Sequence, residues 1–145
     1  MSLSSFSASV TTCGVEPGRE EVGDDGLLHV TDRVFTDIVV SSDPRLAGTN
    51  RLTLAMDLDP DAGTGELRGS FVLTPDEVDG SWEGELTGHL DGMVSADGLA
   101  RGTGALDGAI AHIAFRQVPE HPTAEPACDE PLAFYELTGL TLETG

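Results

Sequence analysis

Apolar and polar residues alternate with a period of two along most of the chain from residue 27 onward. In the segment RLTLAMDL, for example, Leu52, Leu54 and Met56 share one face. This period is typical of β-strands that bury one face, and no segment between residues 27 and 118 has the 3.6-residue period of a helix. The alternation predicts strands in six segments, with SFSASV at 5–10 as a further candidate: 27–40, 51–58, 66–73, 81–90, 109–118 and 132–142.

Aspartate, glycine, proline and serine gather between these segments, as expected for hairpin connections. The predicted turns lie at 41–44, 59–63, 79–80, 91–92, 97–98 and 107–108. The first long strand, 27–40, has apolar residues on both faces and is expected to be bent or bulged. About seven or eight antiparallel strands in one domain favour a closed barrel or a tight sandwich, because closure removes unpaired edges.

We treat residues 1–145 as a single domain. Residues 1–25 are expected to form an N-terminal strand or arm. The segment PEHPTAEPACDEP at 119–131 is expected to be a proline-rich surface loop before the last strand.

Two glycine motifs share the form Gly-x-Gly-x-x-x-Gly: GTGELRG at 63–69 and GTGALDG at 102–108. A phosphate loop needs a helix after its glycines, whereas both motifs run into strand-patterned sequence, and the chain has no lysine. We therefore interpret them as equivalent hairpin corners, at which glycine supplies a positive φ or room for a neighbouring strand.

The chain has 26 acidic residues against 7 basic ones, which gives a formal net charge of −19. Such a surface repels phosphate backbones and anionic lipids, so neither nucleic acid nor a membrane is an expected partner. No apolar run is long enough to span a bilayer, and the first residues lack the pattern of a secretory signal. A cytoplasmic location is therefore expected, with secretion left open.

Cys13 and Cys128 are the two cysteines. A disulfide between them would link the two ends of the chain if their segments were adjacent. In a reducing cytoplasm, however, two free thiols are the favoured prediction. Both cysteines have acidic sequence neighbours, which argues against a catalytic thiol.

Metal binding and hydrolysis have weak support. The histidines lie in different predicted strands or in a loop, without the short spacing of a zinc site: His29, His89, His112 and His121. The segment DLDPDAGTGELR alternates aspartates as a calcium loop does, but Ala62 stands where glycine is needed and Arg68 where glutamate is needed. The chain has no Gly-x-Ser-x-Gly elbow. No metal and no cofactor are expected.

Parts of the chain resemble known barrel families. The stretch GHLDGMVSADGLARGTGALDGAIAHIAFRQV resembles the C-terminal half of allene oxide cyclase and dirigent proteins, in which a glycine corner precedes such a strand. The segments VSSDPRLAGT, GSFVL and GSWEGELTG are similar to small bacterial barrels of unknown function. The resemblance covers residues 27–118 and rests on structural glycines. It implies an all-β fold, a single antiparallel calycin-like β-barrel of about eight strands.

The same resemblance implies a lumen that holds a small apolar molecule, cofactor-free cyclisation in some members, and a homo-dimer or homo-trimer. The catalytic positions of the cyclase have no match in this chain. Small residues on the predicted inner face favour space in the lumen, although the glycines would equally serve the curvature of a barrel: Gly69, Gly84, Gly88 and Ala114.

Polar residues in otherwise apolar strands are the candidates for chemistry. The catalytic candidates are Arg33, His112, Arg116 and Glu136. The ligand-binding candidates are Phe35, Trp82, Phe134 and Tyr135. If these faces point inward, the lumen suits a neutral or anionic ligand with carbonyl or hydroxyl groups. If they point outward, the charges are solvated cross-strand pairs, and both interpretations stay open.

Three functions follow from these observations. The first is a barrel that binds a small, mostly apolar metabolite in its lumen. The second is a cofactor-free cyclase or isomerase, in which the lumen orients the substrate and Arg, His or Glu moves a proton. The third is a structural or interaction module with a packed core and large apolar outer patches. We favour the first.

Overall fold

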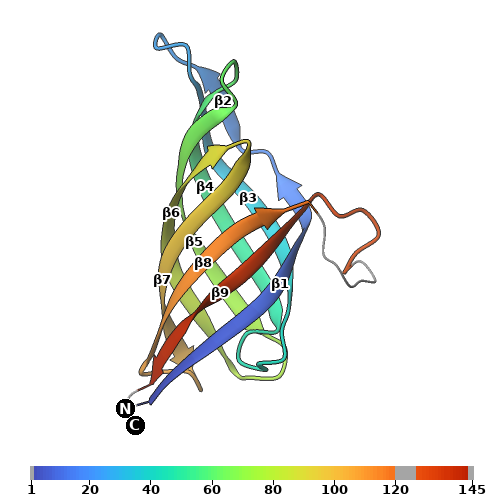
Figure 1. Cartoon of the computed structure of the whole chain (residues 1–145), viewed down its shortest axis with the longest axis vertical. Helices are drawn as coiled ribbons and strands as arrows, with labels where there is room; N and C mark the ends of the chain where they lie inside the picture. The colour runs from blue at the N-terminus through green and yellow to red at the C-terminus, as the bar shows by residue number, and fades with distance from the viewer. Residues whose placement is uncertain (1, 120–126, 144–145) are drawn as a thin grey trace.

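The computed structural model describes residues 2–119 and 127–143, and these residues form strands and turns but no helix (Figure 1). The strands are β1 (Ser2–Glu16), β2 (Arg19–Val22), β3 (Leu28–Val40), β4 (Gly48–Asp59), β5 (Thr64–Pro75), β6 (Gly80–Asp91), β7 (Met93–Gly104), β8 (Ala109–Val118) and β9 (Ala133–Glu143). All strands except β2 close into one antiparallel barrel, because β1 pairs with both β9 and β3. The expected all-β barrel of about eight strands is confirmed.

β1 closes the barrel over its whole length. Residues 2–12 pair with β9 and residues 9–16 pair with β3, so four residues are paired on both sides. The register against β3 shifts between Thr12 and Gly14, which makes Cys13 the extra residue of a β-bulge. The N-terminal strand or arm expected over 1–25 thus contains the strand that closes the barrel, followed by β2.

The long opening strand is β3, and it is bulged as predicted. Its register against β4 shifts between Val30 and Arg33, and Asp32 within the bulge has a φ of 56°. Beyond the end of β1, the first residues of β3 pair with β2 instead. Strands β2 to β5 therefore rise above the rim of the barrel at the end that is uppermost in Figure 1.

The alternation did not predict β2 or β7. Asp97 and Gly98, expected to form a turn, lie in the middle of β7 instead. Gly98 faces the lumen opposite Leu86, where a Cβ would lie 3.3 Å from Cε1 of Phe71. The local preference of an Asp-Gly pair is for a turn, but here the glycine makes room for a ring from another strand.

The two glycine motifs lie in hairpins, but not at equivalent corners. In GTGELRG the first residue, Gly63, is in the β4–β5 turn with a φ of 68°. In GTGALDG the first glycine is inside β7, and the turn comes later, at Gly104 and Gly108, with φ values of 59° and 89°. The two turns lie at opposite ends of the barrel, since β7 runs antiparallel to β4 (Figure 1).

The half of the lumen near the β5–β6 and β7–β8 turns, called here the lower lumen, is filled by side chains. Trp82 is 1% exposed, and its Nε1 donates a hydrogen bond to the carbonyl of Arg45 over 3.0 Å. The ring of Phe71 occupies the space beside Gly84, where a Cβ would lie 2.7 Å from its Cζ. Inward glycines therefore accommodate aromatic rings here, while Ala114, between buried Ile113 and Phe115, is on the outer face.

Cys13 and Cys128 form a disulfide, with Cα atoms 6.1 Å apart, so the prediction of free thiols is wrong. Nearby, the backbone N–H of Leu132 donates to the carbonyl of Thr12 over 2.8 Å. The pairing of β1 with β9 brings the two distant segments together, and sequence spacing alone could not show this. Residues 120–126 of the expected proline-rich loop lie outside the described residues.

Candidate functional site

A cavity lies in the upper lumen, the half towards the β4–β5 and β6–β7 turns. Its volume is about 80 Å³. Most of its wall is aliphatic or aromatic. The lining residues are Thr12, Phe35, Asp37, Leu52, Leu54, Met56, Leu67, Leu86, Val94, Ala96, Phe115 and Tyr135.

Three polar side chains form a buried cluster at this cavity. Asp37 on β3 is 3% exposed, Thr12 on β1 is 3% and Asn50 on β4 is 2%. Thr12 and Asn50 are the direct cross-strand neighbours of Asp37. The hydroxyl of Thr12 donates to Oδ1 of Asp37 over 2.7 Å, and Nδ2 of Asn50 donates to Oδ2 over 3.1 Å. Both carboxylate oxygens therefore accept a hydrogen bond from a neutral group.

Burial dominates the electrostatics of the cluster. It raises the pKa of Asp37 above its ordinary value of 3.8, although the hydrogen bonds from Thr12 and Asn50 act in the opposite direction. Burial, with a smaller effect from the charge of Asp37, raises the pKa of Tyr135 to about 12. Tyr135 is therefore a neutral phenol at any physiological pH.

A second, smaller void touches the cluster from below. Its volume is about 10 Å³, close to the space of a single water, and Asn50 is one of its lining residues. Oδ1 of Asn50 is the one buried side-chain oxygen or nitrogen among the described residues without a hydrogen-bond partner. A buried polar atom needs such a partner, and a water in this void can supply it.

Among the described residues, the cavity lies at the end of the barrel that side chains close less tightly, called here the open end. Several of its lining side chains are half-buried: Phe35, Leu52, Val94 and Tyr135. The side chains that close the lower lumen, such as Trp82 and Leu46, are instead almost fully buried. A small molecule can thus enter from the upper end, past apolar side chains.

Two of the four sequence-predicted ligand residues line the cavity and two do not. Phe35 and Tyr135 line the cavity. Trp82 lines the small void of the lower lumen. Phe134 precedes Tyr135 in β9 and does not line the cavity.

The four predicted catalytic residues are not gathered in the lumen. His112 and Arg116 lie on the outer face of β8, and Glu136 lies opposite Arg116 on β9. The guanidinium of Arg116 donates to backbone carbonyls and lies 3.5 Å from Asp97. Arg33 donates to the carbonyl of Pro17 over 3.0 Å and pairs with Glu20, and it is not among the residues that line the cavity. For β8 and β9, the outward interpretation of these charges therefore holds.

The sequence contains a signal for the buried residues Asp37 and Asn50. Asp37 shares the apolar face of β3 with Phe35 and Val39, and Asn50 continues the face of Leu52 and Leu54. A polar residue in the inward phase of an alternating strand marks a buried polar position. Thr12 meets Asp37 only because β1 closes against β3, and the alternation does not reveal this closure.

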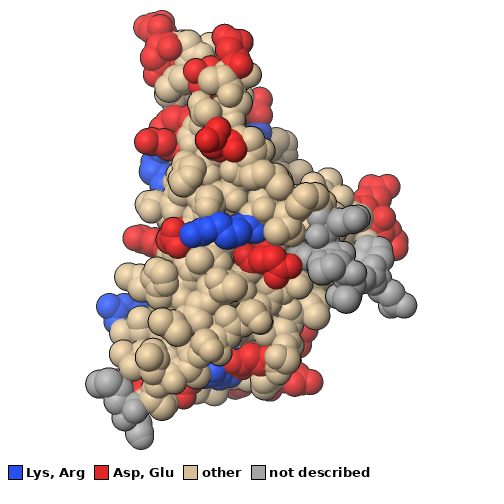
Figure 2. Space-filling view, in the orientation of Figure 1, with Lys and Arg blue, Asp and Glu red and all other residues tan. Residues whose placement is uncertain are grey.

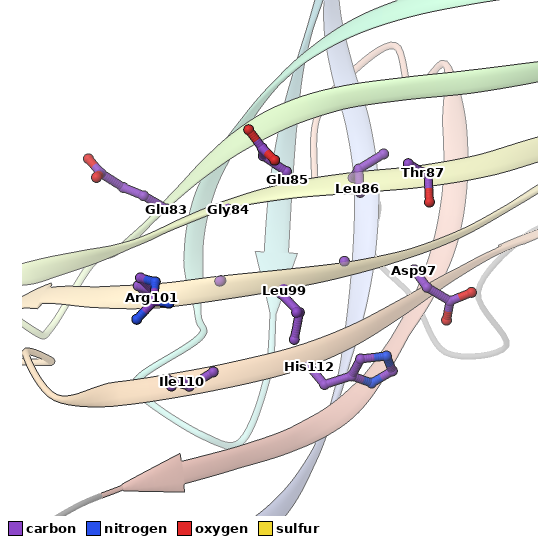
Figure 3. A pocket seen from close by; sticks show the side chains of 12 residues that line it. Glu83, Gly84, Glu85, Leu86, Thr87, Asp97, Leu99, Arg101, Ile110 and His112 are labelled. Atoms are coloured by element: carbon purple, nitrogen blue, oxygen red, sulfur yellow. The ribbon is translucent and has the colours of Figure 1, made fainter.

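An open groove lies on the outer face over β6, β7 and β8 (Figure 3). Its volume is about 710 Å³, and Leu99 near its centre is 61% exposed. Figure 3 shows Glu83 and Glu85 on β6 and His112 on β8, at separate places along the groove. Because these polar groups do not converge, the groove suits contact with another surface better than enclosure of a small molecule.

His29 forms a surface cluster beside the β2–β3 turn. Its Nδ1 lies 2.7 Å from Asp57 and its Nε2 lies 3.1 Å from Asp25. Arg68 pairs with the other oxygen of Asp57 at 3.1 Å. The hydrogen bonds that the ring of His29 donates to Asp57 and then to Asp25 raise the pKa of His29 above 6.5. Within the described residues, no group of three or more His, Cys, Asp or Glu side chains is arranged to hold a metal ion.

Comparison with protein-family models, with curated proteins and with solved structures finds no match to this chain. The closed antiparallel barrel is consistent with a calycin-like fold. The likeness to allene oxide cyclase and dirigent proteins remains a resemblance of sequence motifs. None of the described residues belongs to a helix that could cross a membrane.

Proposed function

We propose that the protein binds a small molecule in the upper lumen, between Asp37 and Tyr135. The observation that carries this proposal is the cavity of about 80 Å³, with a buried carboxyl group on its wall, at the open end of an otherwise packed barrel. Two neutral hydrogen bonds hold Asp37 between β1 and β4, but a charge in an apolar interior costs several kcal/mol unless it is paired, and no cationic residue lines the cavity within the described residues. Asp37 is therefore better explained as part of a binding site.

The size of the cavity limits the ligand. Its volume is about half of the ~150 Å³ of a cavity that admits benzene, and far below the ~300–1,000 Å³ of sites for drug-sized ligands. The enclosed part of the ligand has on the order of three or four non-hydrogen atoms. A longer ligand would extend out past Phe35 and Tyr135. This favours binding over the alternative of a cyclase, which has to enclose a larger, flexible substrate.

Native mass spectrometry, before and after incubation with an organic extract of the source cells, tests the proposal. Ala96 on β7 is 3% exposed and lines the cavity, so Ala96→Leu extends a side chain into it. Ala114→Leu is the matched control, since Ala114 lies on the outer face of β8. We expect a small-molecule adduct on the wild type and on the control, and none on Ala96→Leu. An unliganded wild type in both conditions, or an equal adduct on Ala96→Leu, would contradict the proposal.

The outer face of the barrel favours a second candidate function, association with a second copy of the chain. Exposed apolar side chains lie on the neighbouring strands β7, β8, β9 and β1: Leu99 (61% exposed), Ile110 (39%), Leu140 (46%) and Leu3 (67%). Two polar residues lie among them, since His112 is paired with both Leu99 and Leu140, and Arg101 is paired with Ile110. Figure 2 shows that the lower part of this face carries few charges. Two copies that each carry a charge of −19 repel one another least across such a face, so we propose a homo-dimer here.

Sedimentation velocity tests this second candidate. We expect the wild type to sediment as a dimer. The double variant Leu99→Glu with Leu140→Glu should sediment as a monomer, because its dimer would have to bury unpaired carboxylates at the contact. Val72→Glu, at an exposed apolar position on β5, is the control and should remain a dimer. A monomeric wild type at every concentration would exclude the dimer.

The disulfide also bears on location. Structural disulfides persist in oxidising compartments and are rare in a reducing cytoplasm. We therefore propose that the protein works in an oxidising compartment, contrary to the expectation from its first residues. Alkylation of acid-quenched source cells tests this: unmodified Cys13 and Cys128 are expected, whereas alkylation of both would place the protein in a reducing compartment.

A further inference from the structure

The groups around the cavity define the charge of its ligand, an inference that rests on the proposed function. Among the residues that line it, only Asp37 and Tyr135 have titratable side chains, and Tyr135 is neutral. The residues that contact the carboxylate, Thr12 and Asn50, are neutral too. No arginine or histidine within the described residues lines the cavity. Asp37 is thus a buried acid without a cationic partner at its site.

The free hydrogen-bonding capacity of Asp37 is that of an acceptor. An ionised carboxylate can accept about four hydrogen bonds, and Asp37 receives one on each oxygen. Both of these donors hold the carboxylate in place without neutralising it. A group that fits here brings N–H or O–H donors, and a positive charge in addition makes the hydrogen bond roughly twice as strong.

The cavity wall also suits a cation with a short apolar chain. Phe35, Phe115 and Tyr135 place aromatic rings around the cavity, and ring faces attract ammonium groups. Leu54, Leu67 and other aliphatic residues cover the remaining wall and match an alkyl chain. The wall therefore has complementary regions for both ends of such a molecule.

The field of the protein directs cations towards this end of the barrel. Figure 2 shows acidic side chains gathered at the upper end, around β2 and the β4–β5 turn. The exposed acidic residues there include Glu20, Glu21, Asp24, Asp25 and Asp61. A cluster of one sign of charge raises the local concentration of ions of the opposite sign.

We propose that the ligand of the upper lumen is a small primary ammonium ion with a short apolar chain, whose N–H groups donate to the carboxylate of Asp37. The fold has already removed Asp37 from water, so binding does not require a second desolvation of the anion. The ammonium group loses its own hydration and gains the carboxylate and the aromatic faces in return. An anion is excluded by the same carboxylate.

Three probes of nearly equal size and different charge test this inference: n-propylammonium, 1-propanol and propionate. Isothermal titration calorimetry at about pH 8 measures their Kd values for the wild type and for Asp37→Asn. We expect propylammonium to bind the wild type at least about tenfold more tightly than propanol, and propionate not to bind. In Asp37→Asn, which keeps the side-chain shape and removes the charge, this preference should disappear.

A pH series on the wild type and Asp37→Asn gives a second measurement. Propylammonium should bind the wild type more weakly as the pH falls and Asp37 takes up a proton, while propanol should be unaffected. Thr12 on β1 and Asn50 on β4 do not titrate, and Tyr135 on β9 titrates only near pH 12. The surface carboxylates of the upper end also lose charge as the pH falls, in both proteins, so the part of the change that is absent from Asp37→Asn reports Asp37.

The outcomes separate this inference from the proposed function. If propanol binds the wild type as tightly as propylammonium, or if Asp37→Asn keeps the preference, the ammonium ligand is excluded while binding in the lumen stands. If none of the three probes binds the wild type, both the inference and the proposed function fail.

Discussion

Asp37 and Asn50 face one another across β3 and β4, and Nδ2 of Asn50 donates to Oδ2 of Asp37 over 3.1 Å inside the barrel. On its other side, Asp37 accepts a hydrogen bond from Thr12 of β1. One carboxyl group therefore joins β3 to both of its neighbours, at the seam where β1 closes the barrel. The position that we propose for ligand binding is also a structural one, and its variants have to be judged on stability as well as binding.

The stability of the wild type relative to Asp37→Asn should depend on pH. Burial raises the pKa of Asp37 in the folded state above 3.8, so the folded state binds this proton more tightly than the unfolded chain does. The resulting stabilisation is complete below pH 3.8 and is lost as the pH rises through the raised folded-state pKa. Urea denaturation measures the free energy of unfolding of both proteins. As the pH rises from about 4 to about 8, the value for Asp37→Asn should increase relative to that of the wild type. A constant difference, or one of opposite sign, would show that Asp37 is not buried as described.

His29 should titrate above its ordinary pKa of 6.5, because the protonated ring donates to both Asp57 and Asp25. Its folded-state pKa is raised, so the stabilisation is present below pH 6.5 and is lost as the pH rises through the raised value. Proton NMR of the imidazole resonances, assigned by their loss in His29→Gln, measures this. The difference in melting temperature between wild type and His29→Gln should shrink as the pH rises. An unshifted His29 resonance would mean that the cluster does not form in solution.

Loss of the Cys13–Cys128 disulfide should destabilise the barrel. The bond closes a loop with a sequence separation of 115, and the chain-entropy model gives about 4–5 kcal/mol for a loop of this length. Urea denaturation with and without dithiothreitol should show a loss of about 2–5 kcal/mol on reduction. The double variant Cys13→Ser with Cys128→Ser is the control and should not respond to dithiothreitol. Equal stability of the oxidised and reduced wild type would be inconsistent with this pairing.

Gly84→Ala should lower stability, because the new Cβ would lie 2.2 Å from the carbonyl oxygen of Leu99 and 2.7 Å from the ring of Phe71. Overpacking of this kind costs about 1–3 kcal/mol, and more where backbone has to move. Gly14→Ala is the matched control, since the closest atom to its Cβ would be at 3.6 Å. Thermal unfolding compares the two variants, and equal melting temperatures would count against the close packing of Phe71 on Gly84.

The sequence predicted most of the strands, because one face of each is buried and alternation records this directly. It failed at β7, where Gly98 lies under Phe71 from another part of the barrel. A local turn preference contains no information about an aromatic ring that a strand distant in sequence contributes. The same limit applies to the disulfide, which depends on the long-range pairing of β1 with β9.

The candidate site was predicted only in part. Phe35 and Tyr135 line the cavity, since aromatic residues in strands often face a lumen. The catalytic candidates Arg116 and Glu136 lie opposite one another on β8 and β9, and Arg116 is on the outer face. Alternation defines two faces without saying which one is inside when both contain apolar residues, as in AIAHIAFRQV.

Methyl NMR of the methionines tests the central claim, that the upper lumen takes a ligand, most directly. The chain has three methionines; Met56 is 9% exposed and lines the cavity, whereas Met93 is 41% exposed and does not. In protein labelled with ¹³C at the methionine methyl groups, titration with n-propylammonium or 1-propanol should shift the Met56 signal saturably and leave Met93 unchanged. Ala96→Leu should abolish the shift. A Met56 signal that stays in place with both probes, or that moves no more than Met93, would contradict a ligand site in the lumen.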